Sequence, residues 1–444
     1  MFLLSDKIID KLISNKFEID CIEIKLIQKI DDGPLVYEGP GAIFQDEFGQ
    51  LNLKMYSRNS ELKKEFNCFF KNRVPGKLVE RDSYFSLKAI DMSGNEWHSD
   101  DIRVSPHMSL PAQGQVVKAK LRSIETGGIG SSSELNYLTI FMPGKYSIPC
   151  NEIEELPNGG RSLNRSVFSA NNINFELKEN KEYLVIRANA SPEYLQESAC
   201  WMVNEALSII TGIIMWPVAI MQTQQESSSI KIRSKFNKTN KEFSKPFKVS
   251  SPEDIQSFIS FVEKYLSAME RPHSELFGYW HKIQRSWQTS LIDSALTLTV
   301  AIEGILKVYY EGIGNADEEI MRQAKAAKKI LTDNDNDEFE DRIKERLLSS
   351  IGNLNQTSPK NALYKLREKN LVTDHMVKEW DILRNQSAHA DKLEEDSEKF
   401  QQHIDSIFTN IALFFRLIFI VIGYNGKYID YSSRGNPEKV WKGS

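Results

Sequence analysis

Cysteine is scarce in this chain of 444 residues. The four cysteines lie far apart, and no two of them form the CxxC pair that many zinc sites use. This spacing argues against a zinc site and suits a reducing cytoplasm, so we expect buried thiols. Their positions are Cys21, Cys68, Cys150 and Cys200.

An excess of positive charge is also lacking. The chain has 56 basic and 61 acidic residues and a formal net charge of −5. The net charge therefore does not indicate nucleic-acid binding, and any contact with RNA must be made by a local basic surface. The hydrophobic content of 41% is enough for ordinary cores. The length predicts two or three domains in a soluble globular protein.

Long uninterrupted apolar runs are absent as well. Residues 206–221 are interrupted by polar residues and Pro217, and residues 411–423 carry Arg416. Both runs are shorter than the roughly 18 to 20 residues that span a bilayer, so we expect buried core helices and no membrane partner. The first 13 residues lack a basic leader and the continuous apolar core of a signal peptide, which indicates a cytoplasmic protein.

The N-terminal part of the chain favours β-strands. Short alternating segments stand between Gly, Pro, Asn or Ser breaks, which is typical of a β-sandwich or barrel. Residues 91–95 are expected to be a hairpin loop, and the glycine-rich residues 127–133 a longer loop. The predicted strands are residues 17–26, 35–44, 50–56, 78–90, 116–124, 135–141, 171–177 and 182–188.

From residue 194 onward the apolar period becomes helical. We expect helices over residues 194–214, 252–270, 290–310 and 400–422, the last ending at Gly423. The fold class is therefore α+β, with a β-rich domain before an all-α bundle. The predicted parts are a β-rich domain at 1–190, a helical and basic connecting region at 191–270, and a helical bundle at 271–444.

One stretch, residues 380–391, combines three side chains suited to acid-base chemistry on a phosphate. A helix turns about 100° per residue, so Asn385 and His389 share one face while Arg384 lies at its border. Trp380 and Leu383 mark the buried side. The structural alternative is that Arg384 pairs with an acidic neighbour and His389 caps a helix end.

The spacing Arg-Asn-x-x-x-His resembles the signature of HEPN domains, helical bundles that include many metal-independent ribonucleases. With the upstream helix that contains residues 301–306 and the β-rich N-terminal region, the chain is similar to the ApeA-type anti-phage HEPN proteins. The likeness of the bundle covers roughly residues 275–430, and that of the N-terminal region is one of architecture. It implies that Arg384, Asn385 and His389 are catalytic, with no cofactor and no metal.

Glu303 lies among apolar neighbours in the helix at 290–310, where Ile292, Leu296, Thr299, Val300 and Leu306 are expected to be buried. The resemblance implies that a carboxylate there orients Arg384 or neutralises its charge. An ordinary exposed glutamate is the alternative.

The only concentrated basic segment is residues 222–252. Three aromatic residues, Phe236, Phe243 and Phe247, lie between its basic residues. The segment would therefore suit a loop whose basic side chains bind RNA phosphates and whose rings stack on a base. The alternative is a solvated connector or an edge hairpin whose lysines discourage strand pairing. The candidate RNA-binding residues are Lys231, Arg233, Lys235, Lys238 and Lys241.

Two other polar clusters do not predict metal sites. The acidic loop at 333–337 lacks the sixth-position glycine and twelfth-position glutamate of a calcium loop. His98, Asp100, Asp101 and His107 have no zinc-binding frame, and we expect them in a loop between strands.

The resemblance implies an abortive-infection endoribonuclease that leaves a 2′,3′-cyclic phosphate. Its partners would be RNA, with transfer RNA as one candidate, a second copy bound through the HEPN bundle, and a phage-derived trigger at the N-terminal domain. The rival interpretations are a catalytically silent HEPN-type binding or dimerisation module and a carbohydrate-binding β-domain protein.

Overall fold

The computed structural model describes most of the chain, and the described residues form two compact units. The first comprises residues 1–200 and 215–239, and the second residues 201–214 and 240–444. This division splits the predicted connecting region, 191–270, between the two units. The described residues are 6–57, 76–107, 114–130, 136–155, 159–189, 197–223, 227–235, 241–310, 313, 318–333, 340–354, 358–388 and 397–443.

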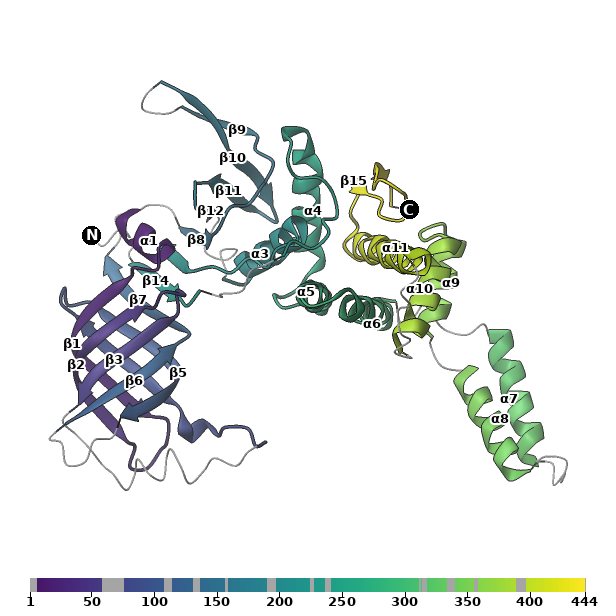
Figure 1. Ribbon diagram of the computed structural model, residues 1–444, viewed down its shortest axis with the longest axis horizontal. Coiled ribbons are helices and arrows are strands. Elements are labelled where there is room, and N and C mark those ends of the chain that lie inside the picture. The colour runs from purple at the N-terminus through teal and green to yellow at the C-terminus, as the bar shows by residue number, and fades with distance from the viewer. Residues whose placement is uncertain are drawn as a thin grey trace. The chain divides into compact units, whose positions relative to one another are not determined.

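Among its described residues, the first unit contains helix α1 (Asp6–Ile13) and one antiparallel sheet of 14 strands (Figure 1). The strands are β1 (Glu18–Gln28), β2 (Val36–Gln45), β3 (Leu51–Ser57), β4 (Phe85–Asp91), β5 (Glu96–His107), β6 (Gln115–Leu121), β7 (Ser123–Gly130), β8 (Tyr137–Pro143), β9 (Glu152–Glu155), β10 (Arg161–Ala170), β11 (Ile173–Glu179), β12 (Tyr183–Asn189), β13 (Ala219–Thr223) and β14 (Ser227–Arg233).

The first six strands close into a barrel in the order β4-β1-β2-β3-β6-β5, because β4 also pairs with β5. Successive side chains of a strand point to opposite faces, and the inward set is apolar and buried. Leu51, Leu53 and Met55 of β3 are at most 1% exposed, and Phe85 and Leu87 of β4 at most 3%. The predicted β-rich N-terminal domain is confirmed, and of the two expected forms, sandwich or barrel, its sheet is barrel-like.

The sheet continues from β5 through β7, β14, β13, β8, β12, β11 and β10 to β9. Strand β14 is hydrogen bonded to β7 on one side and to β13 on the other. Lys231 and Arg233 of the basic segment lie on β14, an interior strand, so the expectation of an edge hairpin is wrong for this part of the segment.

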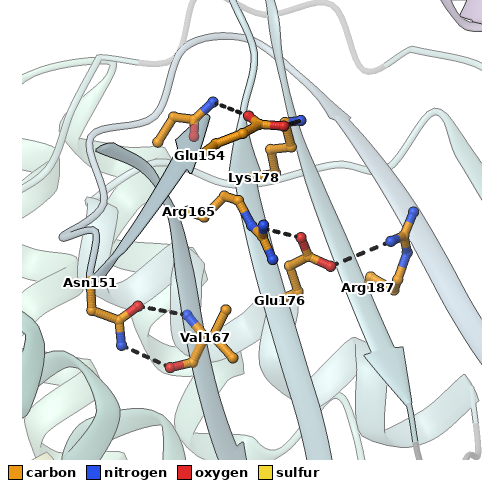
Figure 2. Close-up of polar contacts among 8 residues, drawn as sticks. Asn151, Glu154, Arg165, Val167, Glu176, Lys178 and Arg187 are labelled. Atoms are coloured by element: carbon orange, nitrogen blue, oxygen red, sulfur yellow. Dashed lines mark hydrogen bonds and ion pairs between the residues drawn. The ribbon is translucent and has the colours of Figure 1, made fainter. Parts of the chain in front are cut away.

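A cluster of ion pairs covers one face of the last strands (Figure 2). Glu176 of β11 is 2.9 Å from Nε of Arg165 on β10 and 3.4 Å from Nη1 of Arg187 on β12. Lys178 likewise reaches Glu154 of β9 at 2.6 Å. Opposite charges on neighbouring strands favour this register, because a slip by one residue would move each partner to the other face.

Several strand predictions need correction. Residues 96–107 form strand β5, although we expected a loop around His98. The predicted strand at 116–124 is two strands, β6 and β7, and β7 includes the first part of the predicted glycine loop. The predicted strand at 78–90 begins only at Phe85, since Leu78 is 91% exposed and a short 3-10 helix, η2 (Arg81–Ser83), precedes it.

The second unit consists of helices and one small β-hairpin (Figure 1), which confirms the expected C-terminal helices. Helices α7 and α8 pack against each other as a helical hairpin. The elements are α3 (Glu197–Thr211), of which residues 201–211 belong to this unit, η3 (Pro252–Asp254), α4 (Ile255–Ala268), α5 (Glu275–Trp287), α6 (Leu291–Tyr309), α7 (Glu318–Asp333), α8 (Asp341–Leu354), α9 (Pro359–Glu368), α10 (Asp374–Ala388), α11 (Ser397–Ile422), β15 (Gly426–Ile429) and β16 (Glu438–Trp441).

Helix ends follow their local sequence. The hydroxyl of Ser290 accepts a hydrogen bond from the backbone N–H of Asp293 at 3.0 Å, which caps α6. Gly423 ends α11 with a φ of +70°, a conformation that glycine adopts without steric cost. The predicted ends at Ser290 and Gly423 are confirmed.

Helix α11 is the apolar centre of the second unit. Its 26 residues are long and apolar enough to cross a membrane, yet 67% of the most apolar window is buried inside the protein. Phe414, Phe415 and Phe419 are at most 2% exposed, and the rings of Phe419 and Tyr424 lie 4.8 Å apart. A buried core helix passes the same length and composition test, so the helix is weak support for a membrane span.

Candidate active site

Helix α10 begins and packs as its sequence predicts. The hydroxyl of Thr373 accepts a hydrogen bond from the backbone N–H of Met376 at 3.2 Å, which satisfies an amide of the first turn. Met376, Trp380 and Leu383 are at most 2% exposed and form the apolar stripe of the helix. The predicted burial of Trp380 and Leu383 is confirmed. Arg384 follows this stripe directly and therefore lies at its border.

Arg384 forms an ion pair with Glu303 of α6. Its Nε lies 3.1 Å from Oε2 of Glu303, and the two side chains are 48% and 23% exposed. The guanidinium carbon of Arg384 also lies 5.8 Å from the centre of the ring of the buried Trp380. The expected contact between Glu303 and Arg384 is thus present, at a place that solvent reaches.

A second cation holds the same carboxylate. Nζ of Lys307, one helical turn after Glu303, lies 2.9 Å from Oε1. Partial burial opposes ionisation of Glu303, but hydrogen bonds from Lys307 and Arg384 outweigh it and lower the pKa of the carboxyl. Glu303 is therefore ionised at neutral pH and keeps Arg384 in one orientation. Sequence reasoning missed Lys307, although its spacing of four from Glu303 was visible.

The other two members of the predicted trio are placed differently. Asn385 is exposed near the end of α10. His389 lies outside the described residues. The structure brings Arg384 and Glu303 together on neighbouring helices, and Asn385 follows Arg384 in α10. Arg384 and Asn385 are both exposed, in the part of the helix that follows the buried Trp380 and Leu383.

Helix α6 exposes apolar side chains that we expected to be buried. Thr299 and Leu306 are each 1% exposed, as predicted, but the prediction is wrong for Ile292, Leu296 and Val300, which are 59%, 46% and 57% exposed. These three residues are spaced by four and form one stripe along the helix surface. We call them the α6 stripe.

The core instead faces a different side of α6, set by close packing against α5. A Cβ atom on Gly304 would lie 2.4 Å from the ring of Tyr279, so only glycine allows this approach. Ala301 and Ile305, next to Gly304, are at most 2% exposed. Glu303 lies three residues after Val300, so the α6 stripe leads along the helix surface to the Arg384–Glu303 pair.

The basic segment is mostly engaged within the first unit. The guanidinium of Arg233 lies 4.4 Å from the centre of the Trp216 ring, and the ammonium of Lys235 donates to the backbone carbonyl of Ile13. Burial lowers the pKa of both Arg233 and Lys235. Lys231 is 3.8 Å from Glu125. These three cations do not form a free basic loop.

Beyond β14, the described residues of the basic segment are partly exposed and partly buried. Lys241 is exposed, and its backbone carbonyl accepts a hydrogen bond from Gln284 at 3.1 Å. Lys238 and Phe236 lie outside the described residues. Phe243 and Phe247 are 1% and 0% exposed, so the expected stacking of a base on these two rings is wrong.

The candidate metal ligands His98, Asp100 and Asp101 lie on β5, and His98 has a different partner from the two aspartates. The side chain of His107 lies outside the described part of the structure. Nζ of Lys29 lies 3.0 Å from Asp100 and 2.8 Å from Asp101, while Nε2 of His98 lies 3.6 Å from Glu96. Throughout the described part of the chain, no three His, Cys, Asp or Glu residues are grouped so that they could hold a metal ion.

Comparison of the chain with family models, with curated proteins and with solved structures finds no match.

Proposed function

We propose that the helical unit is a metal-independent endoribonuclease of the HEPN type, and that the whole chain is an ApeA-like cytoplasmic effector of abortive infection. The observation that carries this proposal is the solvent-accessible pair of Arg384 and Glu303 at the Arg-Asn-x-x-x-His motif. Exposed ion pairs contribute only about 0 to 1 kcal/mol to the free energy of unfolding. Stabilisation of the fold is therefore a weak explanation for an ion pair at this exposed place.

RNA supplies its own nucleophile, the 2′-hydroxyl. A base removes the 2′ proton, the oxygen attacks phosphorus, and the bond to the 5′-oxygen breaks as an acid protonates it. The products are a 2′,3′-cyclic phosphate and a 5′-hydroxyl. His389 would act as base or acid because an imidazole has a pKa of about 6.5. Asn385 would orient the imidazole or hold the phosphate.

Arg384 would bind the phosphate oxygens. Within the described part of the chain, its side chain hydrogen bonds through Nε to Glu303. The terminal nitrogens Nη1 and Nη2 can then fork onto two oxygens of one phosphate. Positive charge placed in advance at the phosphate stabilises the charge that develops in the transition state.

A second copy of the chain would complete the site. Each protomer offers one motif histidine, whereas the reaction gains from proton-transfer groups on both sides of the phosphate. A symmetric dimer would supply two arginines and two histidines. The α6 stripe supports this arrangement, because its exposed apolar residues run along the helix to Val300, three residues before Glu303.

The N-terminal β unit would sense a phage-derived trigger or restrain the bundle until one is present. Deletion of residues 1–190 tests this part of the proposal. The remaining chain should lose its response to phage, and unchanged toxicity, RNA cleavage and phage response together would contradict a sensing role.

The central experiment uses purified protein and total RNA in EDTA, with end-group analysis of the fragments. We expect 2′,3′-cyclic ends from the wild type and a loss of about 10² to 10⁴ in rate for Arg384→Ala and His389→Ala, without loss of fold or dimer. Arg342→Ala on α8 is the matched control. Losses under about twofold would favour a catalytically silent module, in which the Arg384–Glu303 pair is structural.

A further inference from the structure

A groove of about 1140 Å³ lies along a second face of α10, between that helix, the first turns of α11 and the turn at 431–436. On α10 its wall is formed by His375, Glu379, Ile382 and Gln386, which are spaced by three or four residues. Gln386 follows Asn385 directly, so the groove reaches the end of the helix that carries the motif.

The turn that forms the opposite wall is held firmly. Asp430 is 2% exposed, and its carboxylate accepts hydrogen bonds from the backbone N–H of Ser432 at 3.1 Å, from Oγ of Ser433 at 2.9 Å and from Nζ of Lys439 at 2.5 Å. These contacts close the turn around one buried charge. Arg434 is therefore presented from a fixed backbone.

Arg434 is available to an anion. Its side chain is exposed and, among the described residues, forms no hydrogen bond or ion pair. The acidic side chains of the groove, Glu379 and Asp405, contact other residues of its lining. Glu379 lies 3.8 Å from His375, and Asp405 accepts a hydrogen bond from Gln401 at 2.9 Å. Lys399 and Arg434 place two cations in the lining against these two carboxylates, and the guanidinium of Arg434 can bind one phosphate at the rim.

The remaining lining is suited to bases. Gln386 and Gln402 are exposed amides with donors and acceptors for base edges. The rings of Phe408 and Tyr431 are stacked 6.1 Å apart at the groove. Burial lowers the pKa of His403, whose Nε2 is enclosed and has no hydrogen-bond partner among the described residues. A buried polar atom without a partner is costly, and a ligand would supply one.

We propose that this groove binds a single-stranded segment of the RNA substrate, with one phosphate on Arg434 and base edges on Gln386 and Gln402. The inference rests on the proposed ribonuclease function and extends it, because it places the strand beside the motif helix. Unpaired bases expose the edges that amides recognise, whereas a duplex hides them, so the chemistry of the groove selects single strands.

The test measures equilibrium binding of a fluorescent 12-nucleotide 2′-O-methyl RNA, which has no free 2′-hydroxyl and cannot be cleaved. Arg434→Ala should weaken binding about tenfold, the usual effect of losing a charged hydrogen bond. The slope of log affinity against log salt should become less negative by about 0.7, the value for one phosphate contact on a single strand. A purely structural role of Arg434 would not change this slope.

Two variants serve as controls. Gln402→Ala should weaken binding about threefold and leave the salt slope unchanged, because it removes a neutral contact. Arg342→Ala, an exposed arginine of α8, should change neither quantity. Circular dichroism and thermal melting verify that each variant is folded. The inference is overturned if the wild type does not bind the RNA or if Arg434→Ala matches Arg342→Ala in both affinity and slope.

The two proposals fail in different ways. If the wild type cleaves native RNA and Arg434→Ala has an unchanged KM and an unchanged affinity for the 2′-O-methyl RNA, the groove assignment fails and the ribonuclease stands. If the wild type binds the RNA but does not cleave it, and Arg434→Ala shows the predicted change in slope, the groove stands as an RNA site and the proposed activity fails.

Discussion

Arg384 and Glu303 are joined across α10 and α6 by a contact of 3.1 Å between Nε and Oε2. The carboxylate is shared, because Lys307 lies 2.9 Å from its other oxygen. Glu303 therefore orients the guanidinium of Arg384 through Oε2, while Lys307 holds its Oε1. This arrangement makes Glu303 a positioning residue for Arg384 in the proposed site.

Glu303→Gln tests that role. The amide keeps the shape of the side chain but loses its charge, so we expect kcat for RNA cleavage to fall about tenfold with little change in KM. Lys307→Ala is the matched control, since it touches the same carboxylate without touching Arg384, and its effect should be smaller. A larger effect of Lys307→Ala, or an unchanged kcat for Glu303→Gln, would contradict the assignment.

The α6 stripe predicts self-association. Leu296→Asp or Val300→Asp places a charge on the exposed stripe and should weaken the dimer at least tenfold, because a buried unpaired charge is costly. Analytical ultracentrifugation measures this change. Ile330→Asp on α7, where the isoleucine is 62% exposed, is the control and should leave association unchanged. A monomeric wild type, or variants that associate normally, would disprove the expected interface.

Much of the β unit could be predicted from alternation, and the exceptions have physical causes. Strand β5 was missed because His98, Asp100 and Asp101 resemble a polar loop, although the aspartates pair with Lys29 at the surface. Closure of the barrel could not be predicted either. It depends on pairing between β4 and β5, and alternation within each strand does not choose partners.

The residue types of the candidate site could be predicted from the sequence better than the burial of its neighbours could. Spacing and resemblance together predicted the contact between Glu303 and Arg384. The phase of α6 was not predictable, because apolar residues lie on all sides of the helix, and its packing against α5, with Gly304 close to the ring of Tyr279, is visible only in the structure. The prediction that aromatic residues of the basic segment stack on a base was wrong for a similar reason. Composition does not show that Phe243 and Phe247 are buried in the core.

Asp430 predicts a loss of stability at low pH. Burial opposes its ionisation, but hydrogen bonds from Lys439, Ser432 and Ser433 outweigh this effect and lower the pKa of the carboxyl from 3.8 to about 2. The folded pKa lies below the unfolded one, so the stabilisation is present above pH 3.8 and disappears as the pH falls through about 2. It amounts to about 2 kcal/mol.

Urea unfolding of the wild type and Asp430→Asn between pH 5 and pH 2 measures this contribution. The wild type should be more stable by about 2 kcal/mol at pH 5, and the difference should shrink toward pH 2. Ser14→Ala at the exposed end of α1 is a control with no linked carboxyl. A difference that stays constant over this range would show that Asp430 is not the group that titrates.

Glu205 predicts the opposite dependence on pH. The residue is 1% exposed in α3, where Oε2 accepts a hydrogen bond from the hydroxyl of Tyr265 at 2.9 Å and Oε1 accepts one from the backbone N–H of His273. Burial raises the pKa of the carboxyl, and the hydrogen bonds only partly oppose it. The folded pKa lies above the unfolded one, so the stabilisation is complete below the unfolded pKa and is lost as the pH rises through the folded pKa.

Glu205→Gln removes this titration while keeping an oxygen acceptor and the volume of the side chain. The free energy of unfolding of the wild type minus that of the variant should therefore decrease as the pH rises from 4 to 8, as measured by urea denaturation at each pH. Glu263→Gln on α4, an exposed glutamate, should show no such trend and serves as the control. A difference that increases with pH would mean that the hydrogen bonds of Glu205, and not its burial, dominate its ionisation.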